Sequence, residues 1–297
     1  MSAAWLMVVA SFLFATMSVC VKLAAAHYGT GEIVFYRSLT GAVVIGLLSR
    51  WQGTTLRTPV PAMHFWRAVT GVTALCLWFY AIGHLPLATA GTLNYTSSVW
   101  MALFLLGGAA MLGTQRVDPR LLVTVAAGFG GVALILRPTI EQQQLWHGLV
   151  GLLSGMISAT AYLQISALGR AGEPESRVVF YFSLGGIVAG AAMTSVSGWH
   201  GHDWAGIGLL VAVGLLATVA QLLMTRAYAK GRALVNASLQ YLGIAFSFAY
   251  GVLLFGDHVT WMAVAGMLLI VAAGVRATLL RARVQVAPPS TLTPTDT

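Results

Sequence analysis

Residues 81–95 read AIGHLPLATAGTLNY, and residues 227–241 read AYAKGRALVNASLQY. The first, thirteenth and fifteenth residues are identical in the two stretches (alanine, leucine and tyrosine), and Asn94 in the first corresponds to Gln240 in the second. In each copy a turn leads into a long apolar segment whose first residues are unusually polar. These two stretches predict that the chain arose by duplication, and that each half contains one helix with a polar beginning.

Shorter matches extend the duplication along the whole chain. Ala15-Thr16 recurs as Ala159-Thr160, residues 34–38 (VFYRS) recur as residues 179–183 (VFYFS), and Gly131-Val132 recurs as Gly274-Val275. We therefore expect a first five-helix repeat at residues 1–140 and a second at residues 141–284. The remaining residues, 285–297, are rich in Pro and Thr, which is typical of a disordered tail.

The composition places the chain in a membrane. Of its 297 residues, 58% are hydrophobic and only 8% are charged, and the mean hydropathy is +0.82. Soluble domains carry about 25% charged residues, so this chain has too little polar surface to be solvated as a globule. We predict an all-α polytopic membrane protein. The net charge of +8 does not indicate nucleic acid, because the basic residues are scattered among short loops.

Ten segments are long and apolar enough to cross a bilayer, which takes about 20 residues. Helix caps mark several boundaries: Asp118-Pro119 places a capping residue before a proline, and Asp203 and Asp257 lie where caps are expected. The predicted spans are residues 3–26, 31–49, 64–83, 87–112, 119–137, 146–168, 176–197, 204–227, 234–255 and 259–280. A repeat of five spans enters the membrane from opposite sides in its two copies, so we expect two inverted five-helix repeats.

The Lys and Arg residues give the orientation. If the N-terminus is cytoplasmic, 13 of the 16 basic residues lie in inner loops or at inner helix ends. Only Arg137 is then left on the outer side, with Lys22 and Arg37 inside the outer part of the bilayer. Because inner loops carry the excess of positive charge, we predict that both termini are cytoplasmic and that the chain lies in the cell's inner membrane.

These features resemble the drug/metabolite transporter superfamily. Residues 85–104 (LPLATAGTLNYTSSVWMALF) and 254–275 (LFGDHVTWMAVAGMLLIVAAGV) resemble the fourth helix and the ninth-to-tenth helix junction of its EamA-type family. The chain departs from that family where helices four and nine often carry a proline, since residues 97–100 and 242–245 contain none. The resemblance implies transport of small organic metabolites through a central cavity, with helices five and ten at the periphery.

Two basic residues are candidates for attracting a substrate anion. Lys22 and Arg37 fall inside predicted spans, where a charge is costly and therefore functional by default. The alternative for Lys22 is that its ammonium reaches the headgroups, and the alternative for Arg37 is a fixed pair with Glu32 or with a helix C-terminus. A Lys22–Glu32 pair that latches the outer ends of the first two helices is a further hypothesis.

The polar starts of the duplicated helices supply the other candidates. Unpaired polar groups in hydrocarbon are expensive, so these side chains either bond from helix to helix or line a wet cavity, and we expect the cavity. Aromatic side chains could form its wall, although they also serve ordinary packing. The candidate substrate-binding residues are Lys22, Arg37, Trp78, Tyr80, Asn94, Tyr95, Trp100, Tyr162, Gln164, Gln240 and Tyr241.

The sequence lacks the motifs of several other mechanisms. No Asp or Glu lies in the central part of any predicted span, which disfavours proton coupling and leaves facilitated diffusion or exchange. There is no phosphate-binding glycine loop, no metal-ligand spacing of His and Cys, and no nucleophile elbow. We therefore expect no cofactor, no metal and no catalytic residue. His200, His202 and Asp203 could bind a metal in an outer loop, but a solvated helix cap is the preferred interpretation.

The prediction is a secondary transporter that exports small organic metabolites such as amino acids by alternating access. Its partners would be a small-molecule substrate and membrane lipids, with no nucleic acid, and it would act as a monomer or homodimer. Two alternatives stay open. A multidrug or organic-cation exporter would need a carboxylate in the membrane, and a membrane-embedded enzyme would need acid–base or metal groups at one membrane face.

Overall fold

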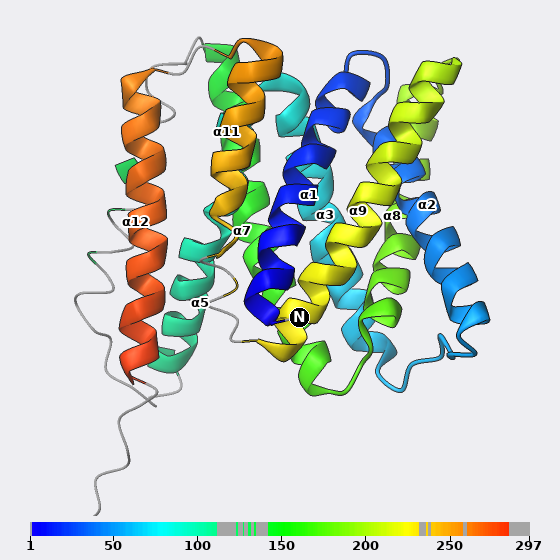
Figure 1. Cartoon of the computed structure of the whole chain (residues 1–297), viewed down its shortest axis with the longest axis horizontal. Coiled ribbons are helices and arrows are strands. Elements are labelled where there is room, and N and C mark those ends of the chain that lie inside the picture. Colours follow the sequence, from blue (N-terminus) through cyan, green and yellow to red (C-terminus); the bar gives the residue numbers. More distant parts are fainter. Residues whose placement is uncertain are drawn as a thin grey trace, which may run out of the picture.

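The computed structural model of the chain describes residues 2–111, 142–231, 236, 239–257 and 260–284, with isolated positions between 123 and 134. Every regular element in this part of the chain is an α-helix (Figure 1). The helices are α1 (Ala3–Ala24), α2 (Thr30–Trp51), α3 (Pro61–His84), α4 (Leu87–Tyr95), α5 (Ser97–Met111), α7 (Gln142–Arg170), α8 (Glu175–Ser197), α9 (Trp204–Lys230), α11 (Leu242–Phe255) and α12 (Trp261–Val284).

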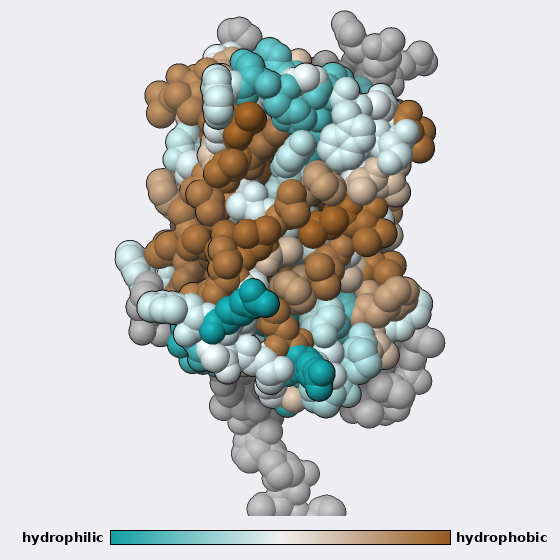
Figure 2. Space-filling model, turned by 90° about the vertical axis from the view of Figure 1, so that its right-hand side faces the viewer, coloured by the Kyte–Doolittle hydropathy of each residue, from teal (hydrophilic) through white to brown (hydrophobic). Residues whose placement is uncertain are grey.

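Six of these helices, α1, α2, α3, α7, α8 and α9, are long and apolar enough to cross a membrane. The side of the bundle seen in Figure 2 carries a broad hydrophobic band between two hydrophilic ends. Trp51, Trp204 and Trp261 are strongly exposed at helix ends, where tryptophan side chains settle at a membrane–water interface. The surface is therefore the one expected of a bundle embedded in a bilayer.

Local sequence signals set the helix ends. The Ser2 hydroxyl accepts a hydrogen bond from the Trp5 N–H at 3.3 Å, and an Asp203 oxygen accepts one from the Gly206 N–H at 2.8 Å. These side chains satisfy backbone donors that have no partner within their own helix. Pro61 opens α3 at a position where a missing N–H costs nothing. Gly256, with a φ of +61°, ends α11.

The fourth predicted span is not one continuous helix. α4 ends at Tyr95 and α5 begins at Ser97, and the intervening Thr96 hydroxyl donates to the Leu93 carbonyl at 2.6 Å. A turn at Gln240 and Tyr241 likewise precedes α11. Both interruptions fall in the duplicated polar stretches, where side chains compete with the backbone for its hydrogen bonds. The predicted span 119–137 lies largely outside the described residues, as does the beginning of the predicted span 234–255.

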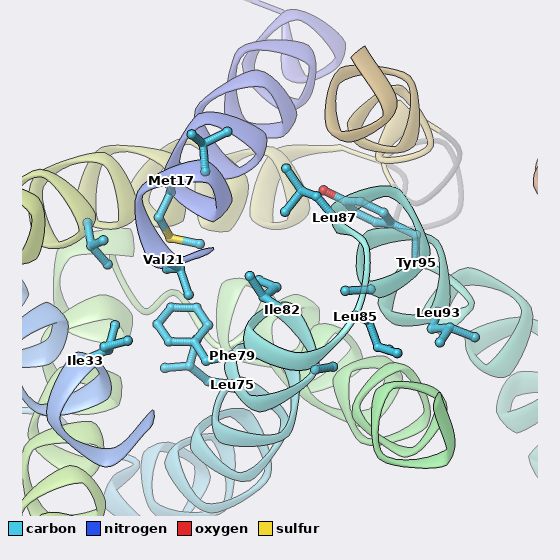
Figure 3. Packing of buried hydrophobic residues seen from close by; sticks show 14 of the residues in the cluster. Met17, Val21, Ile33, Leu75, Phe79, Ile82, Leu85, Leu87, Leu93 and Tyr95 are labelled. Carbon is cyan, nitrogen blue, oxygen red and sulfur yellow. The ribbon is translucent and has the colours of Figure 1, made fainter. Parts of the chain in front are cut away.

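Most of the closely packed helix pairs join the first half of the chain to the second half. α1 packs against α9, α3 against α7, α2 against α8, and α4 against both α7 and α11. α12 lies at one edge of the bundle, and its last residues reach the same end of the bundle as the beginning of α1 (Figure 1). In the interior, Met17 and Val21 of α1 meet Leu75 and Phe79 of α3 (Figure 3).

Glycines let two of these pairs approach closely. A Cβ at Gly190 on α8 would lie 2.6 Å from the Phe35 backbone nitrogen of α2, and one at Gly155 on α7 would lie 2.6 Å from the Leu93 carbonyl oxygen of α4. Both glycines therefore serve helix packing. Backbones that touch in this way stabilise helix association in lipid, where no hydrophobic effect acts between helices.

Gly190→Ala is expected to destabilise the protein by about 1–3 kcal/mol, because the new methyl group meets backbone rather than a movable side chain. Gly46→Ala is the matched control, since a Cβ there on α2 meets nothing within 4 Å. Removing a glycine from an open helical position should stabilise it by about 0.5–1 kcal/mol. Thermal unfolding in detergent compares the two variants, and equal effects would remove the close-contact account.

Candidate functional site

A cavity of about 60 Å³ lies at the centre of the bundle, between helices of both halves. One water needs roughly 10–15 Å³, so the space admits a few waters but not a metabolite. Its wall combines apolar, aromatic and polar side chains. The lining residues are Met7, Ser11, Phe14, Met17, Arg37, Arg67, Gly71, Ala74, Leu75, Trp78, Asn94, Tyr95, Ser158, Ala161, Tyr162, Phe182, Gln221, Met224 and Gln240.

Two arginines dominate the charge of this cavity. Arg37 comes from α2 and Arg67 from α3, and each is only 3% exposed. Their guanidinium carbons lie 4.8 and 4.4 Å from the centre of the same ring, that of Phe182 on α8. A cation over an aromatic face is attracted by the ring's quadrupole, but the ring supplies no counter-charge. Within the described part of the chain, the Nε atoms of both arginines have no hydrogen-bond partner.

Polar groups from the two interrupted helices meet α7 at the cavity wall. The Asn94 side-chain amide donates to the Ser154 hydroxyl at 2.9 Å and, more weakly, to the Ser158 hydroxyl at 3.4 Å. The Gln240 side-chain amide donates to the Met224 sulfur at 3.6 Å, and Tyr162 of α7 lines the same wall. The side-chain oxygen of Gln240, Oε1, has no hydrogen-bond partner among the described residues. Asn94 and Gln240 therefore occupy corresponding places in the duplication and face the same cavity.

No acidic residue lines the cavity in the part of the chain that the structure describes. At the end of the bundle where α1 terminates, here called the Lys22 end, the ammonium of Lys22 lies 3.6 Å from an Asp257 oxygen and donates to the Leu85 carbonyl at 3.1 Å. Glu32 lies 2.8 Å from His200 and 3.2 Å from His202. The hypothesis of a Lys22–Glu32 latch is therefore wrong, because the α8–α9 loop supplies the partners of Glu32.

The same contacts bear on the metal alternative for His200, His202 and Asp203. Both histidines turn toward Glu32, and Asp203 caps α9. No group of three metal-ligating side chains occurs among the described residues.

Six of the eleven candidate residues line the cavity: Arg37, Trp78, Asn94, Tyr95, Tyr162 and Gln240. The other five lie elsewhere. Lys22 is held in its ion pair, Tyr80 stacks on His84 at 4.2 Å, and Gln164 accepts a hydrogen bond from Thr70 at 2.7 Å. Trp100 packs beside Phe104 in a second hydrophobic cluster, and Tyr241 lines an apolar groove between α11 and α12.

Arg67 was expected in an inner loop or at an inner helix end, and Phe182 was not a candidate residue. The predicted third span begins at residue 64, which leaves Arg67 at its edge, whereas α3 begins at Pro61. At a rise of 1.5 Å per residue the Arg67 Cα is then about 9 Å inside the helix. The glycine one turn later, Gly71, was the available signal that the Arg67 side chain extends forward along its own helix.

The opposite end of the bundle, here called the Glu173 end, has its own ion pairs. A Glu173 oxygen lies 2.8 Å from His64 Nε2, and the other accepts from Arg177 at 2.9 Å. Burial raises the pKa of Glu173, but the hydrogen bonds from His64 and Arg177 outweigh burial and hold this pKa below its usual value. This cluster joins α3 to the short connection between α7 and α8.

A pH titration tests this cluster. The lowered pKa means that the stabilisation by Glu173 is complete above the ordinary glutamate pKa of about 4.3 and is lost as the pH falls through the folded-state value. Glu173→Gln should therefore lower the unfolding temperature at pH 7, and the gap to the native protein should shrink below about pH 4.3. Glu175→Gln, at an exposed pair with Arg226, is the control and should change little. A gap that stays constant down to pH 3.5 would contradict this assignment.

Known proteins match this chain in sequence and in fold. The model of the EamA-like transporter family matches residues 1–137 and again residues 145–277. The pseudopaline exporter CntI of Pseudomonas aeruginosa (strain UCBPP-PA14) is 35% identical over 270 residues, covering 90% of this chain and 93% of the exporter. A riboflavin transporter of Rhizobium johnstonii is 27% identical over 246 residues, covering 81% of this chain and 76% of that protein. One crystal structure aligns with this chain at a TM-score of 0.67 and 19% sequence identity. The alignment covers 95% of this chain and 98% of the chain in that structure, so the two share a fold.

Proposed function

The chain belongs to the EamA-like transporter family, and from this premise we propose that it exports small organic metabolites, with amino acids and related carboxylates as the leading class. Members of this family are transporters and not enzymes, so the chain is a multi-pass membrane transporter of small metabolites. The relatives named as a pseudopaline exporter and as a riboflavin transporter support a transported compound of small-metabolite size.

The proposed architecture is ten transmembrane helices in two inverted repeats, at residues 1–140 and 141–284. The family model matches the chain twice, which supports a duplication. The helix pairs support a two-fold relation between the halves, because the first helix of each repeat packs on the third helix of the other: α1 on α9, and α7 on α3. The second helices, α2 and α8, pack on each other, as do α4 and α11. With five spans in each repeat, the two-fold axis would lie in the membrane plane.

The observation that carries the proposed function is the central cavity at the two helix interruptions. Secondary transporters bind substrates near the midplane, where discontinuous helices of the two repeats meet. In this chain Asn94 and Gln240 flank those interruptions and line one cavity. Asn94, Tyr95, Tyr162 and Gln240 would orient the substrate, Trp78 would form the apolar wall, and Arg37 would attract an anionic group.

A cavity of about 60 Å³ must widen for a metabolite to enter. We propose that the ion pairs at the two ends break in turn: Lys22 from Asp257 at one end, and Glu173 from His64 at the other. Rocking of one repeat against the other would then expose the cavity to each side alternately. In this proposal both termini are cytoplasmic, the chain lies in the inner membrane as a monomer or homodimer, and transport proceeds by facilitated diffusion or exchange.

An organic-cation exporter is the weaker candidate. A cation in this cavity would meet Arg37 and Arg67 without a described carboxylate to pair with. Like charges in a low-dielectric site repel by several kcal/mol, on the order of 4 kcal/mol at 4 Å.

Transport by Asn94→Ala and Gln240→Ala in proteoliposomes tests the site. A panel of amino acids, dicarboxylates, phosphate compounds, riboflavin and organic cations first identifies a transported compound with the native protein. Each variant should then transport it about tenfold more slowly, the equivalent of one lost hydrogen bond of about 1.4 kcal/mol. Gln164→Ala, which removes an amide outside the cavity, is the matched control and should keep the native rate. Native rates in both cavity variants would exclude these residues from the site.

A further inference from the structure

The two arginines of the cavity lack a counter-charge within the described protein. All five acidic residues in the described part of the chain are engaged elsewhere. Glu32 pairs with histidines, Glu173 with His64 and Arg177, Glu175 with Arg226, and Asp257 with Lys22, while Asp203 caps α9. Asp118, Glu141 and Asp296 lie outside the described residues. Two unpaired charges in a buried site are strongly destabilising, and a fold keeps them only where something else compensates.

Gly71 shows that the position of Arg67 is built into the fold. A Cβ at Gly71 would lie 2.9 Å from the Arg67 guanidinium carbon and 3.0 Å from Cε2 of Phe182, and it would clash with Arg67 Nη1. The guanidinium therefore occupies the space that a side chain at position 71 would fill, one turn further along α3. It is held against Phe182 and the cavity, and away from the nearby end of its own helix.

The shared ring also limits the distance between the two charges. Because both guanidinium carbons lie within 5 Å of the Phe182 centre, their separation cannot exceed the sum of the two ring distances. Both arginines line the same cavity, so one small molecule bound there can contact both. Guanidinium groups are planar forks that bind carboxylate or phosphate oxygens in pairs.

We propose that the transported compound is a small organic anion with two negative charges, as two carboxylates or one phosphate group, held between Arg37 and Arg67. The proposal rests on the proposed function and narrows its substrate class. A zwitterionic amino acid would leave both buried positive charges uncompensated, and a monoanion would leave one. A dianion neutralises the pair, and the amides of Asn94 and Gln240 then take its remaining polar groups.

Thermal unfolding of the purified full-length protein with matched ligands tests the charge requirement. Glutarate, glutamate and glutamine have the same carbon chain length but net charges of −2, −1 and 0. At equal ionic strength the unfolding temperature should rise most with glutarate and least with glutamine. Inorganic phosphate forms a separate arm, and a larger rise with phosphate than with glutarate assigns the dianion to phosphate compounds. Equal rises with glutarate and glutamine, or no rise with either dianion, would overturn the proposal.

Variants locate the effect at the arginines. Arg37→Gln and Arg67→Gln should each weaken the apparent affinity for the dianion at least about tenfold, since a hydrogen bond to a charged group contributes about 1.5–3 kcal/mol. Without ligand these variants should unfold at the native temperature or above it, because a buried repulsion is removed. Arg226→Gln, at an exposed arginine outside the cavity, should respond to ligand as the native protein does.

Gly71→Ala keeps both charges but displaces Arg67, and it provides the test if an arginine variant fails to fold. It should weaken dianion binding while leaving the response to ionic strength unchanged, and a native dianion response in Gly71→Ala would contradict the role of Arg67. The outcome is separable from that of the transport assay. If proteoliposomes transport neutral or cationic compounds but not dianions, only the charge requirement is contradicted. If they transport none of the compounds, the proposed function itself is contradicted.

Discussion

Lipid hydrocarbon offers no hydrogen-bond partner, so every polar group within the bundle must find one inside the protein. In this chain that constraint sorts the charges by place. Carboxylates and their partners lie at the two ends, where Lys22 meets Asp257 and Glu173 meets His64. Hydroxyl and amide groups lie inside, where the Asn94 side chain bonds to Ser154 on α7. Among the residues that the structure describes, the arginine pair departs from this pattern, and it does so at the wall of the cavity.

The interrupted helices follow from the same constraint. A helix that breaks in hydrocarbon exposes backbone groups, and here the Thr96 hydroxyl bonds to the Leu93 carbonyl at the break. The break also lies where Gly155 brings α7 against α4. Close packing therefore shields the irregular backbone, while the neighbouring residues Asn94 and Tyr95 reach the cavity. No proline is needed to interrupt the helix, because the polar side chains replace the lost backbone bonds.

Sequence reasoning predicted the helices well and the site in part. Apolar length and caps placed most described helix ends within a few residues, since both signals are local. The polar starts of the duplicated helices pointed to Asn94 and Gln240, which do share a cavity. Pairings across the bundle were missed: Lys22 was matched with Glu32 from their nearness in the chain, but Asp257, far along the sequence, is its partner. Arg67 was missed because the predicted edge of its helix began too late.

The arginine pair has an electrical consequence. A carrier that moves a dianion without a compensating ion transfers two negative charges across the membrane in each cycle. Moving one elementary charge through 100 mV corresponds to about 2.3 kcal/mol, or a concentration ratio of about 50-fold. The interior of a cell is negative, so the voltage itself pushes such an anion outward. The two fixed positive charges would thus select cargo that the membrane potential expels, with neither a proton gradient nor nucleotide hydrolysis required.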